Sequence, residues 1–251
     1  MASMSMVKTK IECIRPHWPA PRDVRACTTT RIGGVSEGAW AGLNLGDHVE
    51  DDPKAVADNR ARLAAQLGLP GEPQWLSQVH GTQVHLPGQP LACADACFDD
   101  RPGYVCAVLT ADCLPVLMCN TAGTRVAAAH AGWRGLLAGV LEHTAAAFDD
   151  PPEQIMAWLG PAIGPAAFEV GDEVRADFVA ETVASARHFQ PHGATHWLAD
   201  LYGLARDRLA GVGIRQVSGG DLCTFSDPAR FFSYRRDGVT GRMASLIWLT
   251  P

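Results

Sequence analysis

Short apolar runs separated by glycine, proline and polar residues dominate the chain, and few stretches have helical spacing. Runs of four to eight apolar or β-branched residues that end at turn residues are typical of buried strands. We expect strands at 24–31, 74–79, 82–86, 104–110, 114–119, 125–129, 155–159, 214–218 and 243–249.

Helical spacing predicts four helices, at 53–67, 135–148, 171–185 and 200–210. The first has clear end signals, because Asp52-Pro53 precedes it and Gly68 follows it. Strands and helices alternate without a strict βαβ rhythm. We therefore expect an α+β fold, a single-domain layered α/β sandwich with mixed β-sheets over residues 11–251, after a flexible start at 1–10.

Charge and composition exclude several classes of protein. The 21 Lys and Arg against 27 Asp and Glu give a net charge of −6, which disfavours binding to nucleic acid or an anionic membrane surface. No signal peptide opens the chain, and no apolar run is long enough to cross a bilayer. Eight cysteines in 251 residues are too few for a disulfide scaffold. These features favour the cytoplasm, where thiols stay reduced.

Three polar residues that bind metals well follow predicted strands. They are His80, Cys113 and His130, each at a strand end where irregular backbone usually carries function. Two imidazoles and one thiolate leave a tetrahedral Zn²⁺ one open position, which is typical of a catalytic zinc site. Their spacing matches no compact metal motif, so the spacing alone also allows buried structural histidines and a buried cysteine.

The same residues allow a second interpretation, in which Cys113 is a nucleophile and His130 its base, oriented by Asp112 or Gln78. A reactive thiolate needs a positive neighbour, and Arg134 at the start of the 135–148 helix is suited to this and to holding an anion. Arg134 would otherwise cap a surface loop.

Copper is a further alternative, because two histidines and a cysteine with Met118 nearby superficially suggest a blue-copper centre. A true laccase also needs several His-x-His pairs, and the chain contains none. The sequence therefore argues against a multicopper oxidase.

Other histidines and cysteines are expected to be ordinary. His188, His192 and His196 have helical spacing, but Pro191 and Gly193 interrupt it, so we expect a solvated loop. Cys93 and Cys97 lack a second pair of ligands, which makes a structural zinc there improbable, and Cys106 and Cys119 lie in apolar runs typical of core.

Five segments together resemble the bacterial laccase-domain family, whose members are named polyphenol oxidase, purine nucleoside phosphorylase or peptidoglycan-editing factor. The segments are SQVHGTQV (77–84), LTADCLPVLM (109–118), AAAHAGWRGLLAGVL (127–141), LGPAIGPAAFEVGDEV (159–174) and FFSYRRDGVTGRMASLIWL (231–249). The resemblance runs in order from about Thr28 to Leu249. It implies a compact α+β sandwich with a cysteine-hydrolase-like architecture.

The resemblance also implies a metal and an activity. The family's ligands, usually for zinc with copper also reported, correspond to His80, Cys113 and His130. The implied reaction is phosphorolysis of adenosine, inosine and 5′-methylthioadenosine to the free base and ribose 1-phosphate, with adenosine deamination at the same site. The partners are then a purine nucleoside and phosphate. The chain departs from the family at 166–168, where members often carry cysteines that are not ligands.

Roles for the surrounding residues are hypotheses. We expect Cys113, His130 and Asp112 at the catalytic centre, with Asp112 as a proton carrier. Arg134 is expected to hold phosphate, and Asn44 and Gln78 to contact the ribose or base edges.

The arginines near the C-terminus, Arg235, Arg236 and Arg242, form a second anion-binding candidate or a salt-bridged surface cluster.

Two other functions use the same residues. One is a hydrolase that removes a wrongly added amino acid from a nucleotide-linked muramic acid, and the other is a metal-binding protein without catalysis. The modest aromatic content gives no sign of a large obligate interface, so we expect a monomer or a weak dimer.

Overall fold

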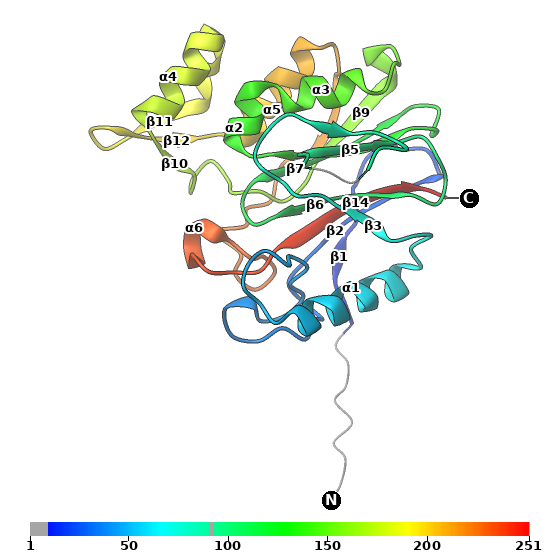
Figure 1. Cartoon of the computed structure of the whole chain (residues 1–251). Coiled ribbons are helices and arrows are strands. Elements are labelled where there is room, and N and C mark those ends of the chain that lie inside the picture. The colour runs from blue at the N-terminus through cyan, green and yellow to red at the C-terminus, as the bar shows by residue number, and fades with distance from the viewer. Residues whose placement is uncertain (1–9, 91–92, 251) are drawn as a thin grey trace, which may run out of the picture.

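The computed structural model describes residues 10–90 and 93–250, so the expected flexible start at 1–10 lies outside the described residues except for Lys10. Two sheets pack face to face, and helices cover their outer faces (Figure 1). A small third sheet lies to one side of the sandwich (Figure 1). The expected α+β class with mixed sheets is confirmed.

The five-stranded sheet holds both ends of the described chain. Its order is β1 (Cys13–Ile14), β2 (Val24–Thr29), β14 (Met243–Leu249), β6 (Val105–Thr110) and β3 (Pro73–Trp75). β3 runs parallel to β6, and the other pairs are antiparallel. Helix α1 (Pro53–Leu67) packs on its outer face through Leu63.

The six-stranded sheet contains the strand that carries His130. Its order is β13 (Gln216–Gly219), β9 (Ile155–Leu159), β7 (Leu114–Asn120), β8 (Val126–Ala131), β5 (Ala96–Asp99) and β4 (Val84–His85). Three helices pack on its outer face: α2 (Trp133–Ala138), α3 (Val140–Ala146) and α5 (Leu201–Gly211).

Both sheets are buried on both faces, which explains why their strands are apolar runs and not alternating patterns. On β7, Leu117 and Cys119 point to the interface between the sheets, whereas Val116 and Met118 point to the helices. On β6, Cys106 similarly faces the other sheet. As expected, Cys106 and Cys119 are fully buried core residues.

The third sheet has the order β10 (Glu169–Gly171), β12 (His196–Ala199) and β11 (Phe189–His192), and α4 (Asp172–Glu181) follows β10. The predicted solvated loop around His188, His192 and His196 is wrong, because β11 and β12 form a hairpin in which His192 pairs with His196. Pro191 is tolerated because β11 is an edge strand.

The helix predictions differ in outcome. Asp52 accepts a hydrogen bond from the Lys54 amide at 3.0 Å and Gly68 has a φ of 60°, so both predicted ends of α1 are confirmed. The predicted helix at 135–148 is two helices, because Gly139 adopts a φ of 98°. The predicted helix at 171–185 ends at Glu181, and a 3₁₀ helix, η3 (Val183–His188), follows it.

Three short segments complete the structure: the 3₁₀ helices η1 (Gly38–Trp40) and η2 (Pro152–Gln154), and α6 (Tyr234–Asp237). Among the described residues, no helix combines the length and apolarity that a membrane crossing requires.

Candidate metal centre

Cys113 lies on the link that passes from one sheet of the sandwich to the other. β6 belongs to the five-stranded sheet and β7 to the six-stranded sheet, so 111–113 crosses between them. Asp112 on this link has a φ of 96°, and its carboxylate accepts hydrogen bonds from the hydroxyls of Thr224 (2.6 Å) and Ser233 (3.0 Å) and from the amide of Arg235 (2.7 Å). These bonds hold the link and thereby fix the position of Cys113.

His130 and His80 come from different elements of the fold. His130 lies on β8, paired with Pro115 of β7, and its side chain is buried. His80 lies on the loop between β3 and β4 with a φ of 61° and is exposed. The antiparallel pairing of β7 and β8 therefore brings His130 next to Cys113, and a separate loop supplies His80.

A buried carboxylate holds both histidines in place. Asp95 accepts hydrogen bonds from the amides of Val79 (3.1 Å), His80 (2.9 Å) and Gly81 (2.6 Å), and it bonds Nδ1 of His130 at 2.8 Å. With Nδ1 committed to Asp95, Nε2 is the ring nitrogen of His130 that remains for a metal. The partner that orients His130 is thus Asp95, and neither Asp112 nor Gln78 bonds to this ring in the described structure.

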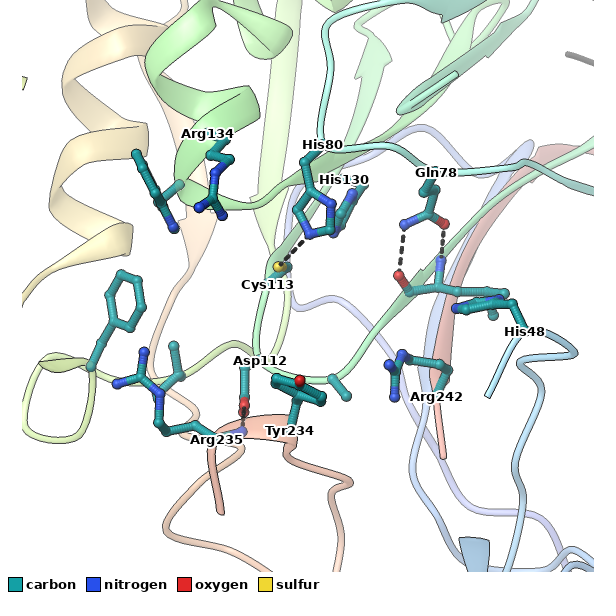
Figure 2. A pocket seen from close by; sticks show the side chains of 15 residues that line it. His48, Gln78, His80, Asp112, Cys113, His130, Arg134, Tyr234, Arg235 and Arg242 are labelled. Carbon is teal, nitrogen blue, oxygen red and sulfur yellow. Dashed lines mark hydrogen bonds between the residues drawn. The ribbon is translucent and has the colours of Figure 1, made fainter. Parts of the chain in front are cut away.

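The three predicted ligands converge. One ligand atom from each of His80, Cys113 and His130 lies within 4.8 Å of the others, and Nε2 of His80 is 3.8 Å from Sγ of Cys113 (Figure 2). No other group of three His, Cys, Asp or Glu side chains in residues 10–90 and 93–250 is gathered in this way. Gly132 keeps the space open, because a Cβ there would lie 2.9 Å from Sγ of Cys113.

The electrostatics of the trio favour a thiolate at Cys113 beside a protonated ring at His130. Burial would raise the pKa of the Cys113 thiol, but His130 and His80 outweigh burial and lower that pKa to about 6. Burial would lower the pKa of His130, but the Cys113 thiolate and the Asp95 carboxylate raise it to about 9. A thiolate with two imidazoles fits the ligand chemistry of Zn²⁺.

A blue-copper centre fits less well. Met118, the thioether that such a centre would use, is fully buried and packs toward the helices with Val116 and Leu136. The structure therefore gives no weak axial sulfur beside the three ligands from this residue.

A cavity of about 510 Å³ opens over the three ligands. Its wall combines polar and aromatic side chains (Figure 2) and contains His48, Gln78, Asp112, Trp133, Arg134, Phe168, Tyr234, Arg235 and Arg242. Gln78 accepts from the Leu109 amide at 2.7 Å and donates to the Leu109 carbonyl at 2.8 Å, so its amide group is held at the edge of β6. The structure thus brings five of the predicted site residues besides Gln78 to one cavity: His80, Asp112, Cys113, His130 and Arg134.

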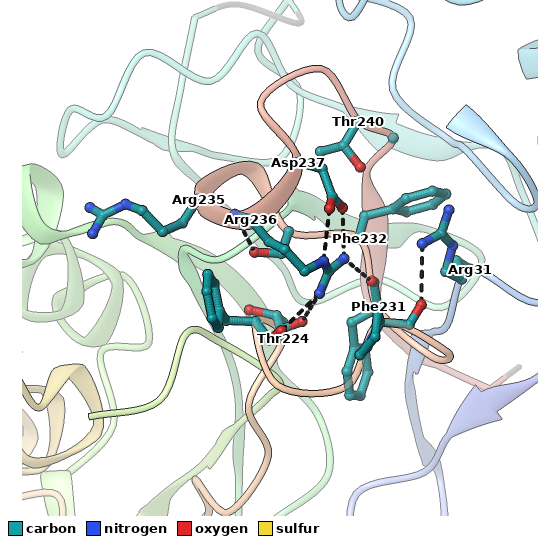
Figure 3. A network of polar contacts seen from close by, with 12 residues as sticks. Arg31, Thr224, Phe231, Phe232, Arg235, Arg236, Asp237 and Thr240 are labelled. Atoms are coloured by element: carbon teal, nitrogen blue, oxygen red, sulfur yellow. Dashed lines mark hydrogen bonds and ion pairs between the residues drawn. The ribbon is translucent and has the colours of Figure 1, made fainter. Parts of the chain in front are cut away.

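The C-terminal arginines do not act as one cluster. Arg236 donates to the carbonyls of Thr224 (2.8 Å) and Phe231 (2.9 Å) and pairs with Asp237 (2.7 Å), which makes it a structural residue outside the cavity (Figure 3). Arg235 lines the cavity while donating to the Glu169 carbonyl at 2.7 Å.

Arg242 also lines the cavity and donates to the carbonyls of Thr240 and Gly241. Burial lowers the pKa of Arg242, although the nearby Cys113 and Asp112 oppose that effect.

Asn44 is not in the cavity wall. It is completely buried, where Oδ1 accepts from the amides of Gly46 (3.0 Å) and Arg242 (2.9 Å), and Nδ2 donates to Asp51 (2.8 Å). In this place it supports the backbone of Arg242 instead of facing a substrate.

Three residues of the site carried little signal in the sequence. Asp95 lies just before the short strand β5, which we did not expect, and its role depends on contacts with 79–81 and His130. His48 and Tyr234 line the cavity from a glycine-rich loop and from α6. Tyr234 stands in the conspicuous aromatic segment FFSYRR (231–236), and this is the sequence signal that could have found it.

Comparison with known proteins assigns the chain to a family. The family model described as multi-copper polyphenol oxidoreductase laccase matches residues 25–250. The Escherichia coli K12 protein named purine nucleoside phosphorylase YfiH is 59% identical over 239 residues, which cover 94% of this chain and 98% of that protein. The Pseudomonas aeruginosa protein named purine nucleoside phosphorylase PA4543 is 54% identical, with 94% and 98% covered.

Solved structures agree with the fold. Protein NMB0706 of Neisseria meningitidis superposes with a TM-score of 0.91 at 51% identity and covers 95% of this chain and 99% of that one. YlmD from Geobacillus stearothermophilus has a TM-score of 0.86 at 28% identity, with 97% and 99% covered. On the match over 226 of its residues (25–250) and these relatives, the chain belongs to the multi-copper polyphenol oxidoreductase laccase family.

Proposed function

We propose that the protein is a metal-dependent purine nucleoside phosphorylase that converts adenosine, inosine and 5′-methylthioadenosine, with phosphate, to the free base and ribose 1-phosphate, and that also deaminates adenosine. The observation that carries this proposal is the convergence of His80, Cys113 and His130 at the base of a cavity that arginines line. The names of the relatives from Escherichia coli and Pseudomonas aeruginosa support it.

The residues present fit a zinc ion. A thiolate and two imidazoles are the donor set of a catalytic zinc, and Asp95 fixes the tautomer of His130. When bound, Zn²⁺ would supply Lewis acidity at the base of the cavity.

Aromatic side chains of the cavity would hold the purine. Trp133, Phe168 and Tyr234 line the wall, and their flat faces suit stacking on a planar base. The amide of Gln78 keeps one further donor and one further acceptor site beyond its bonds to Leu109, which suits an edge of the base or the ribose.

Arginine side chains would hold the phosphate. Helix α2 has only six residues, so the guanidinium of Arg134 is the anion ligand in this proposal, with Arg235 also on the cavity wall. A phosphate oxygen forms a bond to C1′ while the bond from C1′ to N9 breaks. The electron pair leaves with the purine, which takes up the proton that hydrogen phosphate loses.

Asp112 is a positioning residue in this scheme. Its two carboxylate oxygens already accept three hydrogen bonds, which disfavours its use as a mobile proton carrier. Its hydrogen bonds hold the link that carries Cys113, and the backbone of Arg235, in place beside the cavity.

The test combines metal analysis with product analysis. Purified protein is assayed for bound metal, and inosine is incubated with and without phosphate before chromatography. We expect hypoxanthine only with phosphate, and we expect Cys113→Ser to lose tight metal binding and turnover together. Cys93→Ser, which changes an exposed cysteine, is the matched control and is expected to retain both.

Two outcomes would contradict the proposal. One is nucleoside turnover that survives complete metal removal. The other is absence of product from inosine and adenosine together with cleavage of a muramoyl-amino-acid conjugate, which would favour the editing hydrolase.

A further inference from the structure

A second cavity, of about 460 Å³, adjoins the nucleoside cavity. The two share Trp133, Arg134, Phe168 and Arg235. The far wall of the second cavity consists of Glu169, Val170, Gly171, Glu173, Val174 and His196, which come from β10, the start of α4 and β12. We call this space the side groove. The three-stranded sheet and α4 lie beside α2 (Figure 1). The four residues that line both cavities place the side groove next to the first cavity.

The side groove is lined by charges of both signs. Arg134 and Arg235 line both this groove and the nucleoside cavity, whereas Glu169 and Glu173 line the groove alone. Glu169 is engaged by His192, whose Nε2 lies 3.2 Å from Oε2 of the carboxylate. Glu173 forms no ion pair within residues 10–90 and 93–250, so its charge is available to a ligand.

Gly171 allows the Glu173 carboxylate to lie against the backbone. A Cβ at position 171 would come within 2.6 Å of both carboxylate oxygens of Glu173, so the Glu173 side chain lies close against the Gly171 backbone. The Glu173 side chain is exposed and lines the side groove beside β10, where a ligand in the groove can reach its carboxylate.

Both guanidinium groups retain free donors. Arg235 uses one nitrogen on the Glu169 carbonyl at 2.7 Å, which leaves its other nitrogens unused. Arg134 stacks on the Trp133 ring with 4.3 Å from its central carbon to the ring centroid. Its guanidinium donates no hydrogen bond to any other residue that the structure describes.

We propose that the side groove binds a zwitterionic α-amino-acid group attached at the 5′ position of the nucleoside. The carboxylate of that group contacts Arg235 and its ammonium contacts Glu173, while Arg134 remains for phosphate. This inference rests on the proposed function, which places the ribose in the adjoining cavity.

The charge pattern selects this class of ligand over simpler ones. A purely anionic extension would be repelled by Glu173, and a purely cationic one by Arg235. A neutral extension such as a methylthio group would leave both charges without partners. An α-amino acid carries one charge of each sign, and charges of both signs line the side groove.

The experiment compares three nucleosides with phosphate as co-substrate on the metal-loaded protein: inosine, 5′-methylthioadenosine and S-adenosylhomocysteine. The readout is the ratio of kcat/KM for S-adenosylhomocysteine to kcat/KM for 5′-methylthioadenosine, from chromatography of released adenine. We expect Glu173→Gln to lower this ratio about tenfold, because one charge-assisted contact is lost. Glu181→Gln, an exposed carboxylate at the other end of α4, is the matched control and leaves the ratio unchanged.

The outcomes separate this inference from the proposed function. If inosine and 5′-methylthioadenosine are cleaved but Glu173→Gln leaves the ratio unchanged, the side-groove inference is wrong and the proposed function stands. If no nucleoside is cleaved, the proposed function fails. Calorimetric binding of S-adenosylhomocysteine then decides the inference, since weaker binding by Glu173→Gln supports it and equal binding overturns it.

Discussion

Asp95 connects the two histidines of the metal centre through hydrogen bonds alone. Its side chain is completely buried, and it accepts from three successive amides at 79–81 as well as bonding His130. Burial would raise the pKa of Asp95, but the bonds from His130 and these amides lower it, so the group stays a carboxylate. A single buried anion thus holds both the His80 loop and the ring of His130.

Replacing this carboxylate by an amide tests its positioning role. In Asp95→Asn the side-chain NH₂ would point at a backbone donor or at Nδ1–H of His130, so one hydrogen bond becomes a repulsion. We expect metal affinity to fall 10- to 100-fold, roughly the effect of removing such an outer partner. Competition against a chelating dye measures the affinity, and circular dichroism monitors folding.

Asp58→Asn is the matched control, because Asp58 pairs only with Arg62 on the surface of α1. It is expected to leave metal affinity within twofold. Equal affinity of Asp95→Asn and the unchanged protein would show that the histidines are held by other contacts.

At the scale of single residues, the sequence singled out the three side chains that converge, but it gave no signal for the residues that support them. His80, Cys113 and His130 each follow an apolar strand, so the local pattern marked them. Asp95 acts through partners 14 to 35 positions away, and only the pairing of β5 with β8 brings it there. Asn44 looked similar in a polar loop, yet burial turns its amide inward.

The junction between β8 and α2 determines how much room lies between the proposed metal ligands. Gly132 is the residue before α2, and a side chain there would lie 2.9 Å from both Sγ of Cys113 and Cδ2 of His80. Both neighbours are proposed metal ligands on segments that the Asp95 and Asp112 carboxylates hold by hydrogen bonds, so neither can move without opening the site.

Gly132→Ala is therefore expected to weaken metal binding at least tenfold while the sheets stay folded. The physical reason is steric, since a contact of 2.9 Å is shorter than real Cβ contacts. Metal affinity and thermal unfolding are measured on the same preparation. Gly211→Ala, at the end of α5 where a Cβ would meet nothing within 4 Å, is the control. Full metal affinity in Gly132→Ala would contradict this steric role.

The contact between α5 and η3 makes the stability of the fold depend on pH. Asp207 of α5 bonds Nε2 of His188 at 2.8 Å and pairs with Arg187. Burial would raise the pKa of Asp207, but these two partners outweigh it and lower that pKa below its ordinary 3.8. A carboxyl group whose pKa is lower in the folded state stabilises the fold above pH 3.8 and loses this contribution as the pH falls through the folded value.

The free energy of unfolding should therefore fall less steeply below about pH 4 in Asp207→Asn than in the unchanged protein. Urea unfolding between pH 7 and pH 3 measures this slope. Asp177→Asn, an exposed carboxyl group on α4, serves as control. Parallel curves for Asp207→Asn and the unchanged protein would mean that Asp207 has the same pKa folded and unfolded.

At the scale of elements, the sequence predicted most strands of the two large sheets, because strands buried on both faces are continuous apolar runs. β9 appears at 155–159, where the pattern placed it. The hairpin of β11 and β12 did not show this signal, because only Phe189 and Ala199 of its strand residues are buried. The break at Gly139 was also missed, since the apolar spacing continues through it.

The molecule as a whole has a net negative charge, but arginines line its cavity. The net charge of −6 disfavours polyanions such as nucleic acid, while Arg134, Arg235 and Arg242 make the cavity suited to a small anion. The fold class followed from the sequence pattern, whereas the convergence of 80, 113 and 130 depends on how the two sheets pack.

Metal binding should therefore stabilise the entire sandwich. The ligands come from the loop after β3, the link between β6 and β7, and β8, so one ion would connect parts of both sheets. Unfolding separates these segments, and the unfolded chain binds the ion far more weakly. At a free metal concentration 1,000 times Kd, the stabilisation is about 4 kcal/mol, which corresponds to a rise in Tm of roughly 8–16 °C for a chain of this size.

Thermal unfolding of chelator-treated protein, with and without added Zn²⁺, measures this shift. Cys113→Ser lacks the thiolate and is expected to show little response to the ion, whereas Cys93→Ser responds like the unchanged protein. A Tm that Zn²⁺ does not alter, in protein shown to have bound it, would mean that the unfolded chain binds the ion as tightly as the folded chain and would contradict this prediction. A large shift that disappears in Cys113→Ser would show that the ion stabilises the fold through Cys113, which lies on the link between the two sheets.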